Sequence, residues 1–114
     1  MLPSKSPDTR EIEIEGQTFT VRGLTRSEAL HFTTGYTPEA MPDVPLSDRG
    51  DLAETYLLAH GADVTEAEAM AWREATDYRT ADTVLEAILE LSGLMTKKDA
   101  DKKDADPQPG TSAP

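Results

Sequence analysis

Charged and apolar residues alternate strictly in the first patterned part of the chain. Every second residue of Glu11–Glu15 (EIEIE) is isoleucine, and the alternation resumes in Thr18–Arg22 (TFTVR) after a break at Gly16-Gln17. A period of two residues is typical of a strand that buries one face. The sequence therefore predicts a β-hairpin over residues 11–23, with the glutamates and Arg22 facing solvent. The residues expected on the buried face are Ile12, Ile14, Phe19 and Val21.

Two later segments begin with a helix-capping signal. Thr25 and Glu28 have the Thr-x-x-Glu spacing of a capping box, and Thr65 and Glu68 repeat it. In this arrangement each side chain bonds to the backbone N–H of the other residue and satisfies an otherwise unpaired donor. Apolar residues at helical spacing follow each box. The expected helices span residues 26–34 and 66–75.

Two further helices are predicted from apolar periodicity that follows a polar cap. Asp48 is the expected N-cap of a helix over residues 49–60, which should stop at Gly61. Thr80 is the expected N-cap of a helix over residues 81–92. This last helix has the most regular apolar face of the chain, close to the i, i+3, i+4, i+7 pattern of an amphipathic helix.

Three segments lack such a pattern. Residues 1–10 contain two prolines and no apolar periodicity, so a flexible leader is expected. Three prolines in residues 35–47 predict a loop. Residues 95–114 repeat a Lys-Lys-Asp-Ala-Asp unit and end in PQPGTSAP, which predicts a disordered charged tail. The predicted fold is α+β, with an N-terminal two-stranded hairpin packed on a bundle of about four short helices at residues 11–94.

The charge of the chain is strongly negative. Twenty-two Asp and Glu face eleven Lys and Arg, which gives a formal net charge of −11. The tail from Lys97 onward holds four lysines and four aspartates, so removing these leaves eighteen acids and seven bases on the body. Such a field repels nucleic acid and anionic membrane and favours a basic or apolar partner. The alternative is that the excess of acids only keeps the protein soluble. The sequence shows neither a signal-peptide pattern nor a membrane-spanning apolar run, so a cytoplasmic location is expected.

The residue patterns of common enzyme chemistry are missing from the sequence. The chain has no cysteine. Its two histidines, His31 and His60, have no metal-binding spacing. The serines near helix ends are explained by capping or exposure, and the glycines are scattered singly, so neither an activated nucleophile nor a phosphate loop is predicted. We therefore expect no enzymatic activity, no cofactor and no metal site.

Apolar residues in the C-terminal half are the candidates for partner binding. Trp72 is the sole tryptophan and fits either the core of a small domain or an anchor for a partner, the core being favoured. The last helix has an apolar face wider than a single stripe, so part of it is expected to be left for a partner helix. The predicted partner-binding residues are Trp72, Leu85, Ile88, Leu89, Leu91 and Leu94.

Several segments together resemble a known family. The end of the hairpin, "VRGLTRSEA", the segment "LAETYLLAHGADVTEAEAMAW" and the closing "VLEAILELSGL" are similar to tail assembly chaperones of long-tailed (siphovirus-type) bacteriophages. The resemblance covers residues 11–94, and the proline-rich loop matches least. Its motifs are specific in combination rather than singly, and none is a catalytic signature.

The resemblance implies a non-enzymatic factor of virion assembly. Such a protein binds the long, helical, aggregation-prone tape measure protein in the host bacterial cytoplasm and keeps it soluble until tail tube subunits polymerise around it. The tail tube protein is then a second candidate partner, and the factor is expected to be absent from the mature virion. In many such phages a ribosomal frameshift near the end of the gene gives a longer product, for which the region after Lys97 is the candidate position. Self-association is left open.

Two other functions fit the same composition. A structural virion component, such as a head–tail connector or a minor tail protein, would stay in the finished particle. An acidic regulatory module that mimics nucleic acid would occupy a basic groove on another protein, with binding that salt weakens strongly. Contact through apolar surface, as expected of the chaperone, should tolerate salt.

Overall fold

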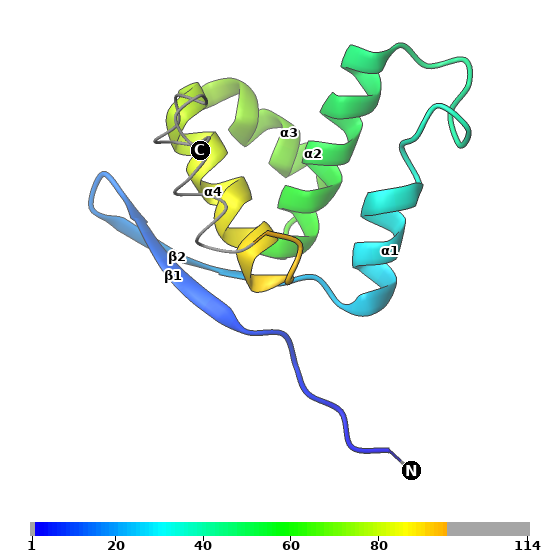
Figure 1. Cartoon of the computed structure of the whole chain (residues 1–114). Helices are drawn as coiled ribbons and strands as arrows, with labels where there is room; N and C mark the ends of the chain where they lie inside the picture. Colours follow the sequence, from blue (N-terminus) through cyan, green and yellow to red (C-terminus); the bar gives the residue numbers. More distant parts are fainter. Residues whose placement is uncertain (1, 96–114) are drawn as a thin grey trace, which may run out of the picture.

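The computed structural model describes residues 2–95 and has the predicted α+β fold, an antiparallel hairpin followed by four helices. The predicted tail lies outside the described residues, except for Met95. The elements are β1 (Thr9–Ile14), β2 (Gln17–Arg22), α1 (Arg26–Thr34), α2 (Leu46–Ala62), α3 (Glu66–Ala75) and α4 (Tyr78–Leu91). In Figure 1 the hairpin curves along one side of the helices, and α1 stands beside α2 on the other side.

β1 and β2 pair with the predicted apolar face toward the helices. The predicted inner-face residues are all buried in whole or in part: Ile12, Ile14, Phe19 and Val21. β1 begins at Thr9 rather than at residue 11, because the end of β2 offers it a partner: Thr9 lies opposite Arg22. The predicted leader over residues 1–10 is therefore two residues too long.

The hairpin turn lies one residue earlier than predicted. Ile14 lies opposite Gln17, so the turn is Glu15-Gly16 rather than Gly16-Gln17. Both turn residues have positive φ, 50° and 84°. A two-residue turn with positive φ at both positions matches the right-handed twist of the flanking strands, and glycine adopts this conformation without strain. Glu15 is thus a turn residue and not the last residue of the strand.

Both predicted capping boxes are present. The Thr25 hydroxyl accepts a hydrogen bond from the backbone N–H of Glu28, whose carboxylate accepts one from the backbone N–H of Thr25. Thr65 and Glu68 form the same reciprocal pair at the start of α3. The predicted bounds of α1 and α3 are confirmed, because the two boxes fix where these helices begin.

α2 extends beyond the predicted residues 49–60 at both ends. It begins directly after Pro45, which is its N-cap, so the prediction of Asp48 as N-cap is wrong. Every residue after Pro45 has a backbone N–H that can take part in helical hydrogen bonds. The helix therefore begins directly after this last proline of the loop. The predicted stop at Gly61 is also wrong. This glycine is buried inside the helix, where a side chain would collide with Ile88 of α4.

α4 begins at Tyr78, earlier than the prediction of residues 81–92. Its N-cap is Asp77 and not Thr80, because the Asp77 carboxylate accepts a hydrogen bond from the backbone N–H of Thr80 at 3.0 Å. Aspartate three residues before an amide donor is among the best N-caps, and Thr80 becomes part of the first turn. At the other end Ser92 is the C-cap, so the predicted helix is one residue too long there.

The core lies where the hairpin, α2 and α4 meet, and its largest fully buried side chains are Leu57, Ile88, Val21 and Val84. The start of the helical region is tied to the end of α4. The backbone N–H of Leu24 donates to the Ser92 hydroxyl at 2.8 Å, and Gly23 packs on the backbone of Leu91 where a side chain has no room. These contacts close the domain between residues that are distant in sequence.

α3 is held against α2 by one arginine. Arg73 donates to Asp51 Oδ1 and Glu54 Oε1, each at 2.7 Å, and to the hydroxyl of the buried Thr55 at 2.9 Å. A guanidinium can satisfy several acceptors at once because its donors are fixed in one plane. The arrangement fixes the rotation of α3 about its axis and so directs Trp72, the preceding residue.

Candidate functional site

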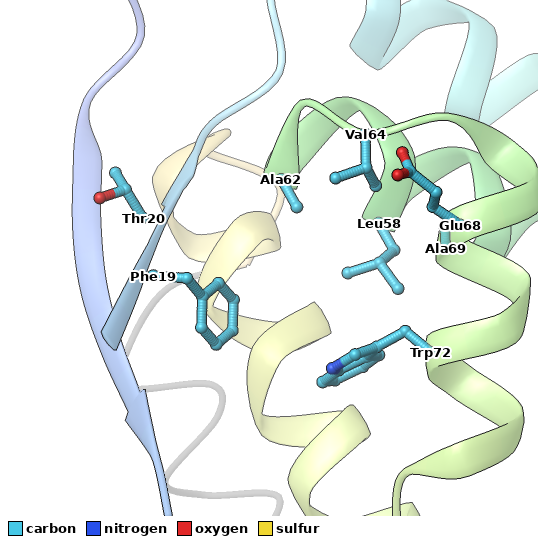
Figure 2. A pocket seen from close by; sticks show the side chains of 8 residues that line it. All are labelled: Phe19, Thr20, Leu58, Ala62, Val64, Glu68, Ala69 and Trp72. Atoms are coloured by element: carbon cyan, nitrogen blue, oxygen red, sulfur yellow. The ribbon is translucent and has the colours of Figure 1, made fainter. Parts of the chain in front are cut away.

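An apolar groove of about 430 Å³ lies between β2, the end of α2 and α3. Figure 2 shows the rings of Phe19 and Trp72 pointing toward one another across it, with Leu58 above the Trp72 ring in this view. The residues that define this apolar groove are Phe19, Thr20, Leu58, Ala62, Val64, Glu68, Ala69 and Trp72. A hollow of this size lined by aromatic and aliphatic side chains is typical of a binding site.

The side chains that line the apolar groove are positioned by three different features of the local backbone. Phe19 points inward because it alternates with solvent-facing residues along β2. Trp72 lies three residues after the buried Ala69, so both occupy one face of α3. Val64 follows Asp63, whose φ of 57° turns the chain at the end of α2, and its N–H donates to the carbonyl of Ala59 at 2.9 Å.

The groove surface is apolar with one carboxylate at its rim. Among the described residues Glu68 is the only charged one in the lining, and its carboxylate accepts a hydrogen bond from the backbone N–H of Thr65 at 3.0 Å. Phe19 and Trp72 are partly buried, and Val64 is 40% exposed. Apolar surface of this kind is stabilised by leaving water, at roughly 25 cal/mol per Å², when a partner covers it.

The structure brings only one of the predicted partner-binding residues to this groove, which is Trp72. Leu85 and Ile88 are buried in the core, and the expectation that they contact a partner is corrected accordingly. Leu89 and Leu91 are partly buried and pack against the same core. Leu94 is 39% exposed beyond the end of α4, and its N–H donates to the carbonyl of Leu89. The apolar face of α4 is wide because the hairpin and α2 both pack on it.

Sequence reasoning missed the other walls of the groove. Phe19 was assigned to the inner face of the hairpin, but its pairing with Trp72 joins segments far apart in the sequence. Val64 lies in the short connection between α2 and α3, where the sequence has no apolar periodicity. No neighbouring residue marks it as part of a binding surface. One signal was available: Phe19 is the only aromatic residue on the predicted inner face of the hairpin.

A second cluster lies close by and is polar. We call it the polar joint; its residues are Arg22, Glu28, His60 and Asp63. The Arg22 guanidinium donates to both carboxylate oxygens of Glu28, at 2.9 and 3.1 Å, and to Asp63 at 3.3 Å. His60 Nδ1 lies 3.0 Å from the second Glu28 oxygen. The joint links the end of β2 and the end of α2 to the first turn of α1.

The environment of Glu28 favours its charged form. The hydrogen bonds from Arg22 outweigh the opposing effect of burial, and with further hydrogen bonds from the Thr25 backbone and from His60 they lower the pKa of Glu28 to about 2. The same pair raises the pKa of Arg22. The Arg22–Glu28 pair is therefore ionised at neutral pH.

A row of aromatic rings extends from His60 of the polar joint to the loop between α1 and α2. Tyr56 lies between the two histidines, with ring centroids 4.6 Å from His31 and 4.2 Å from His60. Tyr36 of the loop contacts His31 edge-on and lies 3.2 Å from it through its hydroxyl. Burial raises the pKa of both tyrosines. Both histidines thus have structural contacts that hold α1 and the loop on α2.

The charges of the described part of the chain leave an acidic surface. Four of its seven basic residues form ion pairs with acids, while eighteen acids are present: the paired bases are Lys5, Arg10, Arg22 and Arg73. Within residues 2–95 no group of three or more His, Asp or Glu is placed to hold a metal ion. Over the same range no helix has the length and apolar character needed to cross a membrane.

Comparison of the chain with protein-family models, with curated proteins and with solved structures finds no match.

Proposed function

We propose that this protein is a non-enzymatic tail assembly chaperone that binds an apolar segment of a tape measure protein in the apolar groove. The observation that carries the proposal is the pair Phe19 and Trp72, which face each other across an open hollow and leave apolar surface in water. Large aromatic side chains in a desolvated pocket supply much of the energy of protein recognition. The groove, at about 430 Å³, is large enough for one or two side chains of a client.

The acidic body supports the same function. A chaperone must stay soluble while it presents apolar surface, and a net charge of −11 disfavours association between copies. Such a charge also favours a basic client. The sequence resemblance supplies the identity of the client, the tape measure protein, with the host bacterial cytoplasm as the place of action and absence from the mature virion as the expected fate.

Co-expression tests the proposal directly. The full chain is expressed with the tape measure protein of the same phage, and we expect more soluble tape measure protein and a complex that co-purifies. Trp72→Ala should reduce both, whereas Tyr78→Ala should reduce neither, because Tyr78 is 84% exposed and lies outside the groove. The complex should persist at high salt, since apolar contact is little screened.

Three outcomes would contradict the proposal. A tape measure protein that gains no solubility and forms no complex excludes the chaperone function. Detection of the chain in purified particles by mass spectrometry favours a structural virion component. Loss of the complex at moderate salt, with no effect of Trp72→Ala, favours an acidic module that binds through charge.

A further inference from the structure

The outer edge of β2 carries backbone groups that no strand pairs with. The residues that flank the hairpin turn form a hydrogen-bonded pair, and such pairs alternate along an antiparallel hairpin with pairs whose N–H and C=O groups point outward. The bond from the Gly23 N–H to the Asp8 carbonyl, 3.0 Å long, fits this alternation at the far end. The backbone groups of Thr18 and Thr20 therefore point away from β1, and within residues 2–95 they have no other hydrogen-bond partner.

This open edge borders the apolar groove. Of the two strands only β2 lines the groove, through Phe19 and Thr20. The Thr20 side chain lies on the solvent face of the hairpin, and yet Thr20 lines the groove. The outer edge of β2 therefore faces the groove, in addition to the inner face of the strand. α3 packs chiefly on α2 and stands across the groove from β2, with Trp72 on the facing side.

We propose that the apolar groove binds its partner as an extended strand that pairs with the open edge of β2, which turns the hairpin into a three-stranded sheet. Addition of a strand beside a helix is a known mode of peptide recognition, in which main-chain bonds provide affinity and pockets for alternate side chains provide specificity. The inference rests on the proposed function only in taking the groove as the partner site. It does not depend on which protein supplies the segment.

The position of the added strand determines its side-chain pattern. Every second side chain points into the groove and contacts Phe19 and Trp72, so these positions must be large and apolar. The others share the solvent face of the sheet with Thr18 and Thr20, directly beyond which lie Glu13 and Glu11 of β1. Strands are spaced by about 4.8 Å, so long basic side chains on this face reach the glutamates. The occupant is therefore a segment in which apolar residues alternate with Lys or Arg.

Two other occupants fit less well. The sequence after Met95 contains no large apolar residue, so the chain's own C-terminal segment has nothing to place between the aromatic rings. A second copy of the chain brings another net charge of −11 to an already acidic surface, and like charges repel. Charge complementarity thus favours a separate basic and apolar partner.

Two peptides of equal composition separate a strand from a helix as the bound form. One has about eight residues, an ordinary strand length, in which Val alternates with Lys. The other has the same residues rearranged so that the valines fall on one helical face. Each is titrated into the full chain and followed by calorimetry and by the fluorescence of Trp72, the sole tryptophan. We expect the alternating peptide to bind more tightly by at least about tenfold.

Two proline variants test the backbone pairing itself. Thr20→Pro removes an outward N–H from the edge of β2 without changing Phe19 or Trp72, and proline is tolerated at such edge positions. Glu11→Pro is the matched control, because Glu11 lies directly opposite Thr20 and its N–H points out of the other edge. Binding of the alternating peptide should weaken by about tenfold or more in Thr20→Pro and much less in Glu11→Pro. In the wild-type complex, hydrogen exchange should show new protection at the amides of Thr18 and Thr20.

The outcomes distinguish this inference from the function on which it rests. If Trp72→Ala abolishes binding of either peptide or of the client while Thr20→Pro binds normally, the groove is the partner site but the strand mode is overturned. Equal loss in Thr20→Pro and Glu11→Pro, or preference for the helical peptide, overturns it as well. If binding of peptides and client is unaffected by Trp72→Ala, both proposals are wrong. A dimer of the free protein by sedimentation, with the edge amides already protected, would identify a second copy as the occupant and overturn the inference.

Discussion

The apolar groove and the polar joint share two elements, β2 and the end of α2, yet they differ in how many of their side chains already have a partner. In the polar joint every charged group has a partner, and the Glu28 side chain is only 19% exposed. In the apolar groove the rings of Phe19 and Trp72 face an open hollow, and Val64 remains in contact with water.

This difference separates stability from binding. Matched donors and acceptors have nothing further to gain from a partner, so the polar joint serves to fix α1 on α2. Apolar surface left in water still gains free energy when it is covered, so the apolar groove is the part of this junction that can bind. Substitutions in the two regions should therefore have different effects on unfolding and on client binding, and four variants test this in order of expected size.

The largest effect should come from the core beneath both regions. Ile88→Ala removes a fully buried side chain that packs against Gly61 of α2. We expect a loss of about 3 kcal/mol in the free energy of unfolding, from lost apolar burial and from the cavity left behind. Urea denaturation followed by circular dichroism measures it. A loss of less than about 1 kcal/mol, the lower range for core truncations, would place Ile88 outside the core and restore it as a surface candidate.

A variant of the groove should lose binding and stability together. Trp72→Ala removes a partly buried ring, so we expect the free energy of unfolding to fall by about 2 kcal/mol. Affinity for the client should fall by at least about tenfold, because the ring is also the proposed anchor. Calorimetric titration of the folded variant, checked by circular dichroism, gives both values. Unchanged affinity would move the client site away from the groove.

A variant of the joint should lose stability alone. Glu28→Gln removes the charge that Arg22 holds, and we expect a loss of about 2 kcal/mol at pH 7, below the full linkage value because the pair still touches solvent. Because the folded pKa of Glu28 is about 2, below its ordinary 4.5, this stabilisation is present above pH 4.5 and is lost as the pH falls toward 2. The wild type and the variant should converge in denaturation midpoint over that range. Client binding at neutral pH should match the wild type, which makes this variant a stability-matched control for Trp72→Ala.

The smallest effect should come from the exposed member of the joint. Asp63→Asn breaks the contact of Arg22 with a carboxylate that is 72% exposed, and surface pairs contribute less than about 1 kcal/mol. Asn also tolerates the left-handed conformation that Asp63 adopts at the end of α2. We therefore expect a change within about 0.5 kcal/mol, measured by the same urea titration. A large loss would show that Asp63, and not Glu28, holds the joint together.

The sequence predicted those parts of the fold that depend on residues close together in the chain. The two capping boxes bond residues three apart, and the strand alternation needs only the next neighbour, so both could be read directly. The predicted end of α2 at Gly61 was wrong because this glycine makes room for Ile88, which lies on another helix. A glycine that ends a helix and a glycine that admits a neighbouring helix look alike in one sequence.

The candidate site was harder to predict for the same reason. Trp72 could be singled out by its type, but Phe19 and Val64 become its neighbours only through the packing of β2, α2 and α3. Leu85 and Ile88 suggested a free surface because a wide apolar face can be covered by the same chain or by another one. Whether this chain or a partner covers the apolar face of α4 depends on how many elements of the chain pack on it. This number cannot be derived from the sequence pattern of α4 alone.

The contact between Leu24 and Ser92 has a consequence for the order in which the domain can form during synthesis. The ribosome releases the hairpin, α1 and α2 first, when Val21 and Leu57 still lack the side chains of α4 that bury them. The fold is complete only once Ser92 has emerged. Until then the apolar side chains of the hairpin and α2 lack the side chains of α4 that cover them.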